Sequence, residues 1–331
     1  MPVGRYDNRL PLTLASGIYD ITRPLINGLV DVEGIRLNVL SDFPNVDNVF
    51  RRMLKLEFDA AEMSVAHYLV CRERGIPMVA IPVFLNRLFP HSFFYRNIAS
   101  QAKTPADLAG KRIGLPQYQV TRAMWLRGVL ADQYGLQRTD VTWVTDFEEK
   151  MEIKPAPGIR IELDRSGRDV NQLLADGVVE AAMSWSRPTA SNTAGFFTDL
   201  KGEETRYYEQ FGIFPMMHTV AVKEEILDQH PWVARCLVDA YTASKQMWYE
   251  WRDFTRGGSL PFARYALAEQ AKVLGDDPFP FEVAPNVKTL ETVVRYALEE
   301  RQITKPIPDV TSLWVQDIAL DERVRQASSA V

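Results

Sequence analysis

Cysteine is scarce in this sequence, and that scarcity excludes two kinds of site. The 331 residues include only Cys71 and Cys236, each inside a helix-like stretch and far apart in the chain. Neither has the partner spacing of a zinc site or of a redox pair. We therefore interpret both as core or half-buried thiols.

Long apolar runs and blocks of positive charge are also absent. No run approaches the length of a membrane span, and residues 1–10 are polar, without the apolar stretch or cleavage site of a secretory signal. Lys and Arg number 38 against 43 Asp and Glu, and the aromatic residues are not interleaved with basic runs. The sequence predicts a globular cytoplasmic protein with no membrane or nucleic-acid partner.

Two further motifs are missing. The sequence has no glycine-rich phosphate loop, which excludes the common nucleotide-binding classes. It also has no Gly-x-Ser-x-Gly elbow, which removes support for a nucleophilic serine.

Strand-like and helix-like stretches alternate over the first ninety residues. Repeated βαβ units of this kind predict a parallel sheet. The expected strands are at 12–16, 35–40, 58–64 and 78–84, and the expected helices are at 20–29, 46–56 and 65–74.

A second α/β unit begins near Arg96. Its expected helices are at 104–108, 121–134 and 170–175, and its expected strands are at 111–115, 141–145 and 180–184. Residues 147–167 mix charge, proline and glycine, and predict a surface excursion. A strand at 219–222 and long helices from Pro231 onward predict a return to the first unit. The chain should therefore form two lobes, residues 1–95 with 216–331 and an inserted 96–215, with a ligand cleft between them.

Several long motifs give the chain a specific resemblance. They are Tyr19–Pro24, Phe50–Leu54, Ala61–Ser64, Ile81–Ser92, Gly114–Thr121 and Gly212–His218. Together they resemble the 4,5-dihydroxyphthalate decarboxylase family, which implies the two-lobed periplasmic-binding-protein type II fold, an α/β fold with a mixed, mostly parallel sheet in each lobe. The resemblance covers about Leu12 to about Trp248, and the tail from Arg252 carries no recognised motif.

The resemblance implies a cytoplasmic enzyme of phthalate catabolism that converts 4,5-dihydroxyphthalate into protocatechuate and carbon dioxide without an organic cofactor. In such a reaction the ipso carbon accepts a proton while the para hydroxyl pushes electron density into the ring. The site must therefore hold a dianion, polarise a phenol and deliver a proton to carbon.

An arginine clamp suits the carboxylates, because the planar guanidinium meets a carboxylate with two hydrogen bonds and stays charged. The candidates are Arg23, Arg87 and Arg187, with Arg87 favoured because the apolar strand before it runs directly into His91 and Ser92. The alternative for each arginine is an ordinary salt bridge.

The expected proton carriers are His91 and His218, which adjoin proline-bearing turns at lobe boundaries. The alternative for each is a histidine that locks a turn. Glu62 ends a buried strand, where a carboxylate is costly unless it is paired or used, so it either orients a histidine or acts as an acid. Its alternative is an ion pair with Arg51 or Arg52.

Neutral side chains complete the predicted site. Thr121 precedes a long helix whose first amides favour an anion, although a simple N-cap is its ordinary role. The other expected contacts to substrate are Ser64, Ser92, Tyr118, Gln119, and the aromatic walls Trp185 and Phe214.

The sequence carries no positive signal for a metal. His67, His91, His218 and Glu62 lack the i, i+4 spacing of a helical ligand pair, so we expect no cofactor and leave a divalent metal open. His67 itself is interpreted as half-buried packing.

Two other functions stay open: a non-catalytic solute-binding protein for a small anionic ligand, and a decarboxylase of a related hydroxybenzoate-type acid. The assembly is either a monomer or a homo-oligomer.

Overall fold

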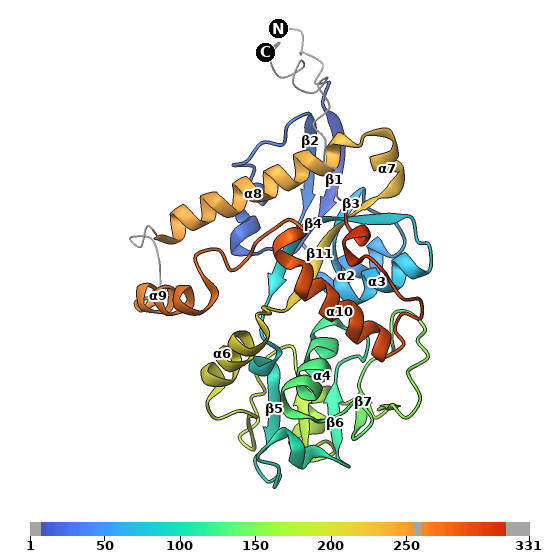
Figure 1. Cartoon of the computed structure of the whole chain (residues 1–331), viewed down its shortest axis with the longest axis vertical. Coiled ribbons are helices and arrows are strands. Elements are labelled where there is room, and N and C mark those ends of the chain that lie inside the picture. Colours follow the sequence, from blue (N-terminus) through green and yellow to red (C-terminus); the bar gives the residue numbers. More distant parts are fainter. Residues whose placement is uncertain (1–7, 254–259, 316–331) are drawn as a thin grey trace.

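Two β-sheets flanked by helices form the framework of the molecule (Figure 1). The computed structural model describes residues 8–253 and 260–315. In these residues the first sheet has the strand order β2-β1-β3-β11-β4, and the second has the order β10-β5-β9-β6-β7-β8. In the view of Figure 1 the first sheet lies above the second.

The strands that build the first sheet come from two distant parts of the chain. They are β1 (Leu10–Ala15), β2 (Ile35–Leu40), β3 (Ala60–Ser64), β4 (Met78–Arg87) and β11 (Met216–Lys223). The strands of the second sheet come from the segment between. They are β5 (Phe94–Asn97), β6 (Arg112–Leu115), β7 (Thr142–Thr145), β8 (Arg160–Leu163), β9 (Ala181–Met183) and β10 (Thr193–Gly195).

The helices follow the strands in the chain and cover the two sheets. The α-helices are α1 (Arg23–Ile26), α2 (Val46–Met53), α3 (Val65–Glu73), α4 (Thr121–Tyr134), α5 (Val170–Ala175), α6 (Leu200–Phe211), α7 (Glu224–Gln229), α8 (Trp232–Asp253), α9 (Ala263–Leu274) and α10 (Val287–Glu299). Short 3₁₀ turns lie at η1 (Asp20–Thr22), η2 (Pro90–Phe93), η3 (Pro105–Leu108), η5 (Ala284–Asn286) and η6 (Val310–Leu313).

The expectation of a parallel first sheet was wrong for one strand. β1 pairs in parallel with β2 and with β3, but β11 enters between β3 and β4 and runs antiparallel to both. A strand that returns from the second sheet supplies this pairing, and local βαβ alternation does not reveal it. The sheets are mixed, as the resemblance implied.

The second sheet contains strands that sequence periodicity did not predict. β8 lies inside residues 147–167, where a surface excursion was expected, and it pairs in parallel with β7. β5, β10 and α6 were also not predicted. β5 straddles the expected lobe boundary at residue 95 and belongs to the second sheet, so the chain crosses over before it. The division into two lobes remains our proposal.

Alternating side chains along the strands bury both faces of the first sheet. Leu12 and Leu14 pack with α8 on one face, whereas Ala15 and Ala61 pack with α2, α3 and α10 on the other. Strands buried on both sides read as continuous apolar runs, which explains why β4 was recognised from sequence.

A close helix contact joins α10 to α4 on the other sheet (Figure 1). A Cβ on Gly128 would lie 2.1 Å from the ring of Tyr296, so only glycine allows the two helices this approach. Beside it, Glu300 forms ion pairs with Arg127 at 2.5 Å and with Arg138 at 2.9 Å. Arg127 and Glu300 are fully buried, so the C-terminal end of α10 is fixed to α4 by charges withdrawn from water.

Candidate active site

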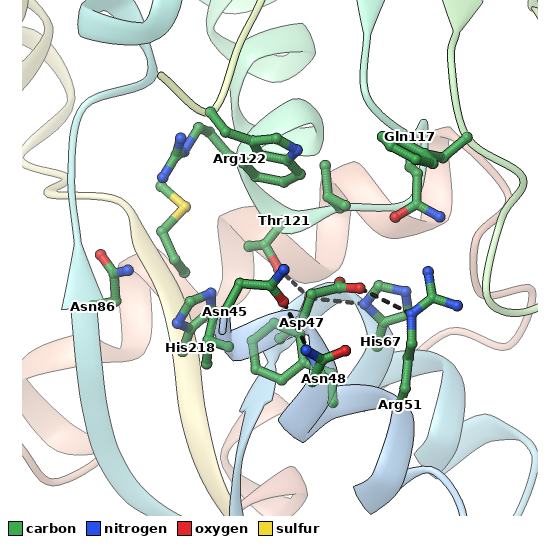
Figure 2. Close-up of a pocket in the computed structure, with 17 residues that line it drawn as sticks. Asn45, Asp47, Asn48, Arg51, His67, Asn86, Gln117, Thr121, Arg122 and His218 are labelled. Atoms are coloured by element: carbon green, nitrogen blue, oxygen red, sulfur yellow. Dashed lines mark hydrogen bonds and ion pairs between the residues drawn. The ribbon is translucent and has the colours of Figure 1, made fainter. Parts of the chain in front are cut away.

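A cavity of about 700 Å³ lies between elements of the two sheets. Figure 2 shows that α2 and α3 supply Arg51 and His67 on one side, and that Thr121 and Arg122 approach from α4 on the other. The end of β11 brings His218 to the same space. Such a position, with walls from both halves of the molecule, is typical of a small-molecule site.

His218 is held by a buried carboxylate. Its Nδ1 lies 2.6 Å from Oε1 of Glu62, and the hydroxyl of Tyr19 donates to the same oxygen at 2.6 Å. Burial, followed by the charge of Glu62, raises the pKa of Tyr19, so the phenol keeps its proton and remains a donor. Because Glu62 accepts at Nδ1, Nε2 is the ring nitrogen left for a bound molecule.

The local backbone explains why Glu62 can serve as this acceptor. β3 and β11 pair antiparallel, which places Glu62 and His218 on adjacent strands. The backbone N–H of Gly17 donates to Oε2 of Glu62 at 2.7 Å. A Cβ on Gly17 would lie 3.1 Å from that oxygen and 3.2 Å from the hydroxyl of Tyr19, so glycine permits the close approach.

Arg122 presents an uncompensated positive charge to the cavity. Its guanidinium carbon lies 3.9 Å from the ring centroid of Phe93 and 5.2 Å from that of Trp185. Nε and Nη1 are buried without a hydrogen-bond partner, and in residues 8–253 and 260–315 no carboxylate forms an ion pair with it. Burial lowers the pKa of Arg122 to about 10, so it stays charged at neutral pH. Arg122 as a whole is half-buried, but a charge whose nitrogens are withdrawn from water without a partner is costly, which indicates an anionic ligand.

A chain of hydroxyl groups connects His67 to α4. Nδ1 of His67 lies 3.0 Å from Oγ of Ser64, which lies 2.8 Å from Oγ1 of Thr121. The N–H of Ala66 donates to Oγ1 of Thr121 at 3.0 Å. Thr121 therefore bonds across the cavity floor to the first sheet and does not cap its own helix.

A second connection crosses the cavity near α2. Nζ of Lys150, on the segment after β7, lies 2.5 Å from Oδ1 of Asp47 and 2.7 Å from Oε1 of Gln117. Arg51 also pairs with Asp47, at 3.0 Å. These two cations keep the pKa of Asp47 below its usual value, despite its burial. The carboxylate of Asp47 is thus already satisfied and is not a free ligand.

The favoured clamp, Arg87, does not line this cavity. Its guanidinium donates to the carbonyl oxygen of Phe214 at 3.0 Å and to the side chain of Asn286. Phe214 itself packs against Phe89 and Phe279. Arg87 is held outside the cavity because the segment before α10 supplies neutral oxygens that accept its hydrogen bonds. The sequence contained no motif for that segment, so this contact was not predicted.

His91 also lies elsewhere. Its Nε2 is 2.9 Å from Oε1 of Gln133, and its ring contacts Tyr134, Phe197 and Tyr207. Burial among these rings lowers the pKa of His91. The arrangement fits the packing alternative.

The remaining predicted residues outside the cavity have identifiable surroundings. Ser92 donates to Glu204, and Arg23 and Arg187 are exposed. Two others are buried: the ring of Tyr118 lies against Arg127, and Gln119 is fully enclosed. A strand-end argument cannot give the direction of each side chain, and these five do not line the cavity.

Five predicted residues do meet at the cavity or directly behind it. They are Glu62, Ser64, Thr121, Trp185 and His218. Glu62 contacts the imidazole of His218, whereas Arg51 and Arg52 pair with other acids.

Sequence reasoning missed Arg122, His67 and Tyr19 as site residues. Arg122 directly follows Thr121, so the predicted anion site at the start of that helix was the signal that could have found it. His67 was interpreted as packing, although it lies three residues after Ser64. Tyr19 lies within a motif that carried the resemblance.

Residues 8–253 and 260–315 also bear on metal binding and on membrane insertion. They contain no group of three or more His, Cys, Asp or Glu side chains placed to hold a metal ion. None of the helices described there is both long and apolar enough to cross a membrane.

Acid titration should report the burial of His67. Burial, reinforced by the charge of Lys150, lowers the pKa of His67 to about 3, whereas the unfolded chain titrates near 6.5. Between pH 6.5 and pH 3 the unfolded state binds a proton at His67 that the folded state does not bind. The free energy of unfolding therefore falls as the pH falls from 6.5 towards 3. Wild type should lose about 2–3 kcal/mol more than His67→Gln between about pH 6.5 and pH 4.5, measured by urea unfolding. An equal loss in both proteins would contradict a neutral, buried His67, and His230→Gln serves as the control.

The chain is similar in sequence to one family model and to two proteins that share a name. The family model described as NMT1/THI5 like matches residues 23–153. A 4,5-dihydroxyphthalate decarboxylase from Comamonas testosteroni is 32% identical over 298 residues, which cover 86% of this chain and 90% of that protein. A second one, from Pseudomonas putida, is 33% identical over 189 residues, which cover 55% of this chain and 73% of that protein.

Comparison with solved structures concerns the fold. A variant of the desulfurization enzyme DszB in complex with biphenyl-2-sulfinic acid aligns with TM-score 0.52 and 16% identity, over 98% of this chain and all of that one. The periplasmic aliphatic sulphonate binding protein SsuA from Escherichia coli aligns with TM-score 0.51 and 12% identity, over 93% and 92%. The fold is that of the periplasmic binding proteins, and the sequence identity and coverage place the chain in the 4,5-dihydroxyphthalate decarboxylase family.

Proposed function

We propose that the protein is a carboxy-lyase that converts 4,5-dihydroxyphthalate into protocatechuate and carbon dioxide. The observation that carries the proposal is the pairing of two unlike groups at one cavity. Arg122 offers a half-buried cation that has no carboxylate partner among the described residues, and His218 offers a ring nitrogen backed by Glu62. An anionic substrate that must be protonated needs both groups.

The reaction assigns a task to each group. Arg122 and the first amides of α4 bind a carboxylate of the substrate. His218, protonated at Nε2, transfers that proton to the ipso carbon while the para hydroxyl group, as phenolate, pushes electron density into the ring. The carbon–carboxylate bond then breaks, carbon dioxide leaves, and the electron pair of that bond restores the aromatic ring. His218 recovers a proton from solvent.

Glu62 and Tyr19 act through His218. The carboxylate at Nδ1 fixes the tautomer and direction of the ring, and the donors from Tyr19 and Gly17 hold the carboxylate in place. Phe50 meets the imidazole edge-on at a centroid distance of 4.9 Å, which restricts the ring further. Such preorganisation keeps Nε2 aimed at the reacting carbon without a change of conformation.

The rival function is capture of a ligand without turnover, and the binding-protein fold favours it. A single assay separates the two. Purified, chelator-treated protein is mixed with 4,5-dihydroxyphthalate, and carbon dioxide and protocatechuate are measured over time. Turnover supports the carboxy-lyase. Binding without turnover, which divalent ions do not restore, would overturn it in favour of the rival.

Removal of Arg122 should weaken substrate binding strongly. Arg122→Ala is expected to lower kcat/KM by about a hundredfold, because a substrate carboxylate would lose its buried, charge-assisted partner. Arg122→Lys should recover part of the loss, since it keeps the charge but not the planar fork. Arg23→Ala is the control, because Arg23 is exposed and does not line the cavity. Unchanged kcat/KM in folded Arg122→Ala would remove Arg122 from the site.

A further inference from the structure

His67 is a buried side chain of the cavity that the proposed chemistry does not use. It lies in the first turn of α3, is 1% exposed, and lines the cavity together with Ser64 and Thr121. Its Nδ1 is bonded to Ser64, whereas Nε2 is buried and has no hydrogen-bond partner in the part of the chain that the structure describes. A buried nitrogen without a partner at a ligand cavity indicates a contact that a ligand completes.

The hydroxyl chain indicates which nitrogen carries the proton. Thr121 accepts the N–H of Ala66, so its own hydroxyl proton is available to Ser64, and the proton of Ser64 is then available to Nδ1 of His67. In this arrangement each hydroxyl proton has an acceptor, and the imidazole proton lies on Nε2. The reverse direction would leave the proton of Thr121 without an acceptor within residues 8–253 and 260–315.

The surroundings of His67 differ from those of His218. Burial, with the cation of Lys150 adding to it and Asp47 opposing it, lowers the pKa of His67 to about 3. At neutral pH the ring is therefore an uncharged donor with one N–H, and it does not carry protons. His218 instead rests on a carboxylate. Two imidazoles in such unlike environments suit two different tasks.

We propose that His67 determines specificity for a ring hydroxyl group, with Nε2–H donating a hydrogen bond to the hydroxyl or phenolate oxygen of the bound substrate. The inference rests on the proposed function, because it assumes an aromatic acid with hydroxyl groups as the ligand. Arg122 supplies the charge that a carboxylate requires, which leaves the uncharged donor for the other kind of oxygen on the ring. A ring without the hydroxyl group would leave Nε2 buried and unpaired, and sites of this kind reject such analogues strongly.

The test compares two ligands that differ only in their hydroxyl groups. Binding of phthalate and of 4,5-dihydroxyphthalate is measured by calorimetry in a His218→Asn background, so that turnover does not consume the second ligand. The protein with His67 should prefer the dihydroxy compound. His67→Phe should reduce that preference at least about tenfold and leave phthalate affinity nearly unchanged. His67→Gln, which keeps an N–H donor, should retain part of the preference.

Controls separate this role from a general loss of structure. His91→Phe replaces a histidine that is equally buried but lies outside the cavity, and it should keep the full preference. If His67→Phe does not fold, His67→Gln and Ser64→Ala are used instead, and the ratio of the affinity for 4,5-dihydroxyphthalate to that for phthalate is measured in each. A ratio unchanged from that of the protein with His67 in both variants overturns the proposal. Equal loss of affinity for both ligands also overturns it, because that result indicates cavity shape.

The outcomes distinguish this inference from the proposed function. If wild type does not turn over 4,5-dihydroxyphthalate but His67→Phe still loses the hydroxyl preference, the function fails and the inference stands. If wild type turns the compound over and His67→Phe keeps the preference, the inference alone fails. A protein that binds neither ligand overturns both.

Discussion

His218→Asn should lower kcat by at least about a hundredfold and leave substrate binding within a few fold. The imidazole lines the cavity and has a carboxylate at Nδ1, and no hydrogen bond within residues 8–253 and 260–315 engages its Nε2. Asparagine keeps a polar group near the position of the imidazole Nδ1, but its amide cannot transfer a proton to carbon. Initial rates of carbon dioxide release and equilibrium binding of the substrate, measured on the same preparation, give the two quantities.

Glu62→Gln tests the role of the His218 imidazole through its carboxylate partner. It should reduce kcat less than His218→Asn does, because the imidazole remains while its orientation loosens. His91→Asn is the matched control: its ring lies among aromatic side chains away from the cavity, so turnover should remain near normal in folded protein. Near-normal turnover in His218→Asn would exclude His218 as the proton carrier.

Glu300→Gln should destabilise the folded protein by about 3–5 kcal/mol, the usual cost of breaking a buried ion pair. The change leaves the guanidinium of Arg127, which is fully buried, without its carboxylate. Arg138 would still pair with Glu299, at 3.0 Å. Urea unfolding at neutral pH gives the free energy of unfolding, provided that the transition is shared by fluorescence and circular dichroism.

A double-mutant cycle sharpens this prediction. Arg127→Met in the Glu300→Gln background should recover part of the stability, because it removes the unpaired charge. Asp239→Asn is the contrast: its partner, Arg235, and Asp239 itself are both exposed, so the change should cost less than about 1 kcal/mol. A cost of that small size for Glu300→Gln would show that water reaches the pair between α4 and α10.

Residues that cap or terminate a helix explain which elements could be predicted from the sequence. The bounds of α4 and α5 were predicted to the residue, since Gly135 takes a left-handed φ of 74° directly after α4 and Asp169 caps α5. The short edge strand β10 carries no such signals. Among the described strands its three residues pair only with β5, so its strand character comes from a distant neighbour.

The candidate site was predictable in its residue types and less so in its geometry. The proposed chemistry requires an arginine and a histidine, and the chain supplies both, but the sequence favoured Arg87 among Arg23, Arg87 and Arg187 and did not single out Arg122. The difference is tertiary: Arg87 bonds to Asn286, almost two hundred residues away in sequence, whereas Arg122 has no carboxylate partner in the described part of the chain. Buried nitrogens without a partner are visible only in three dimensions, and they are the property that distinguishes Arg122.

The insertion of β11 between β3 and β4 has a consequence for synthesis of the chain. Apart from a single bridge from Ala80 to Trp314, β4 pairs among the described strands with β11 alone. Until residues 216–223 leave the ribosome, β4 has no strand to pair with, although β1, β2 and β3 are already available to one another. An apolar strand would therefore stay exposed while the whole second sheet is made, and that interval is when the nascent chain most needs a chaperone.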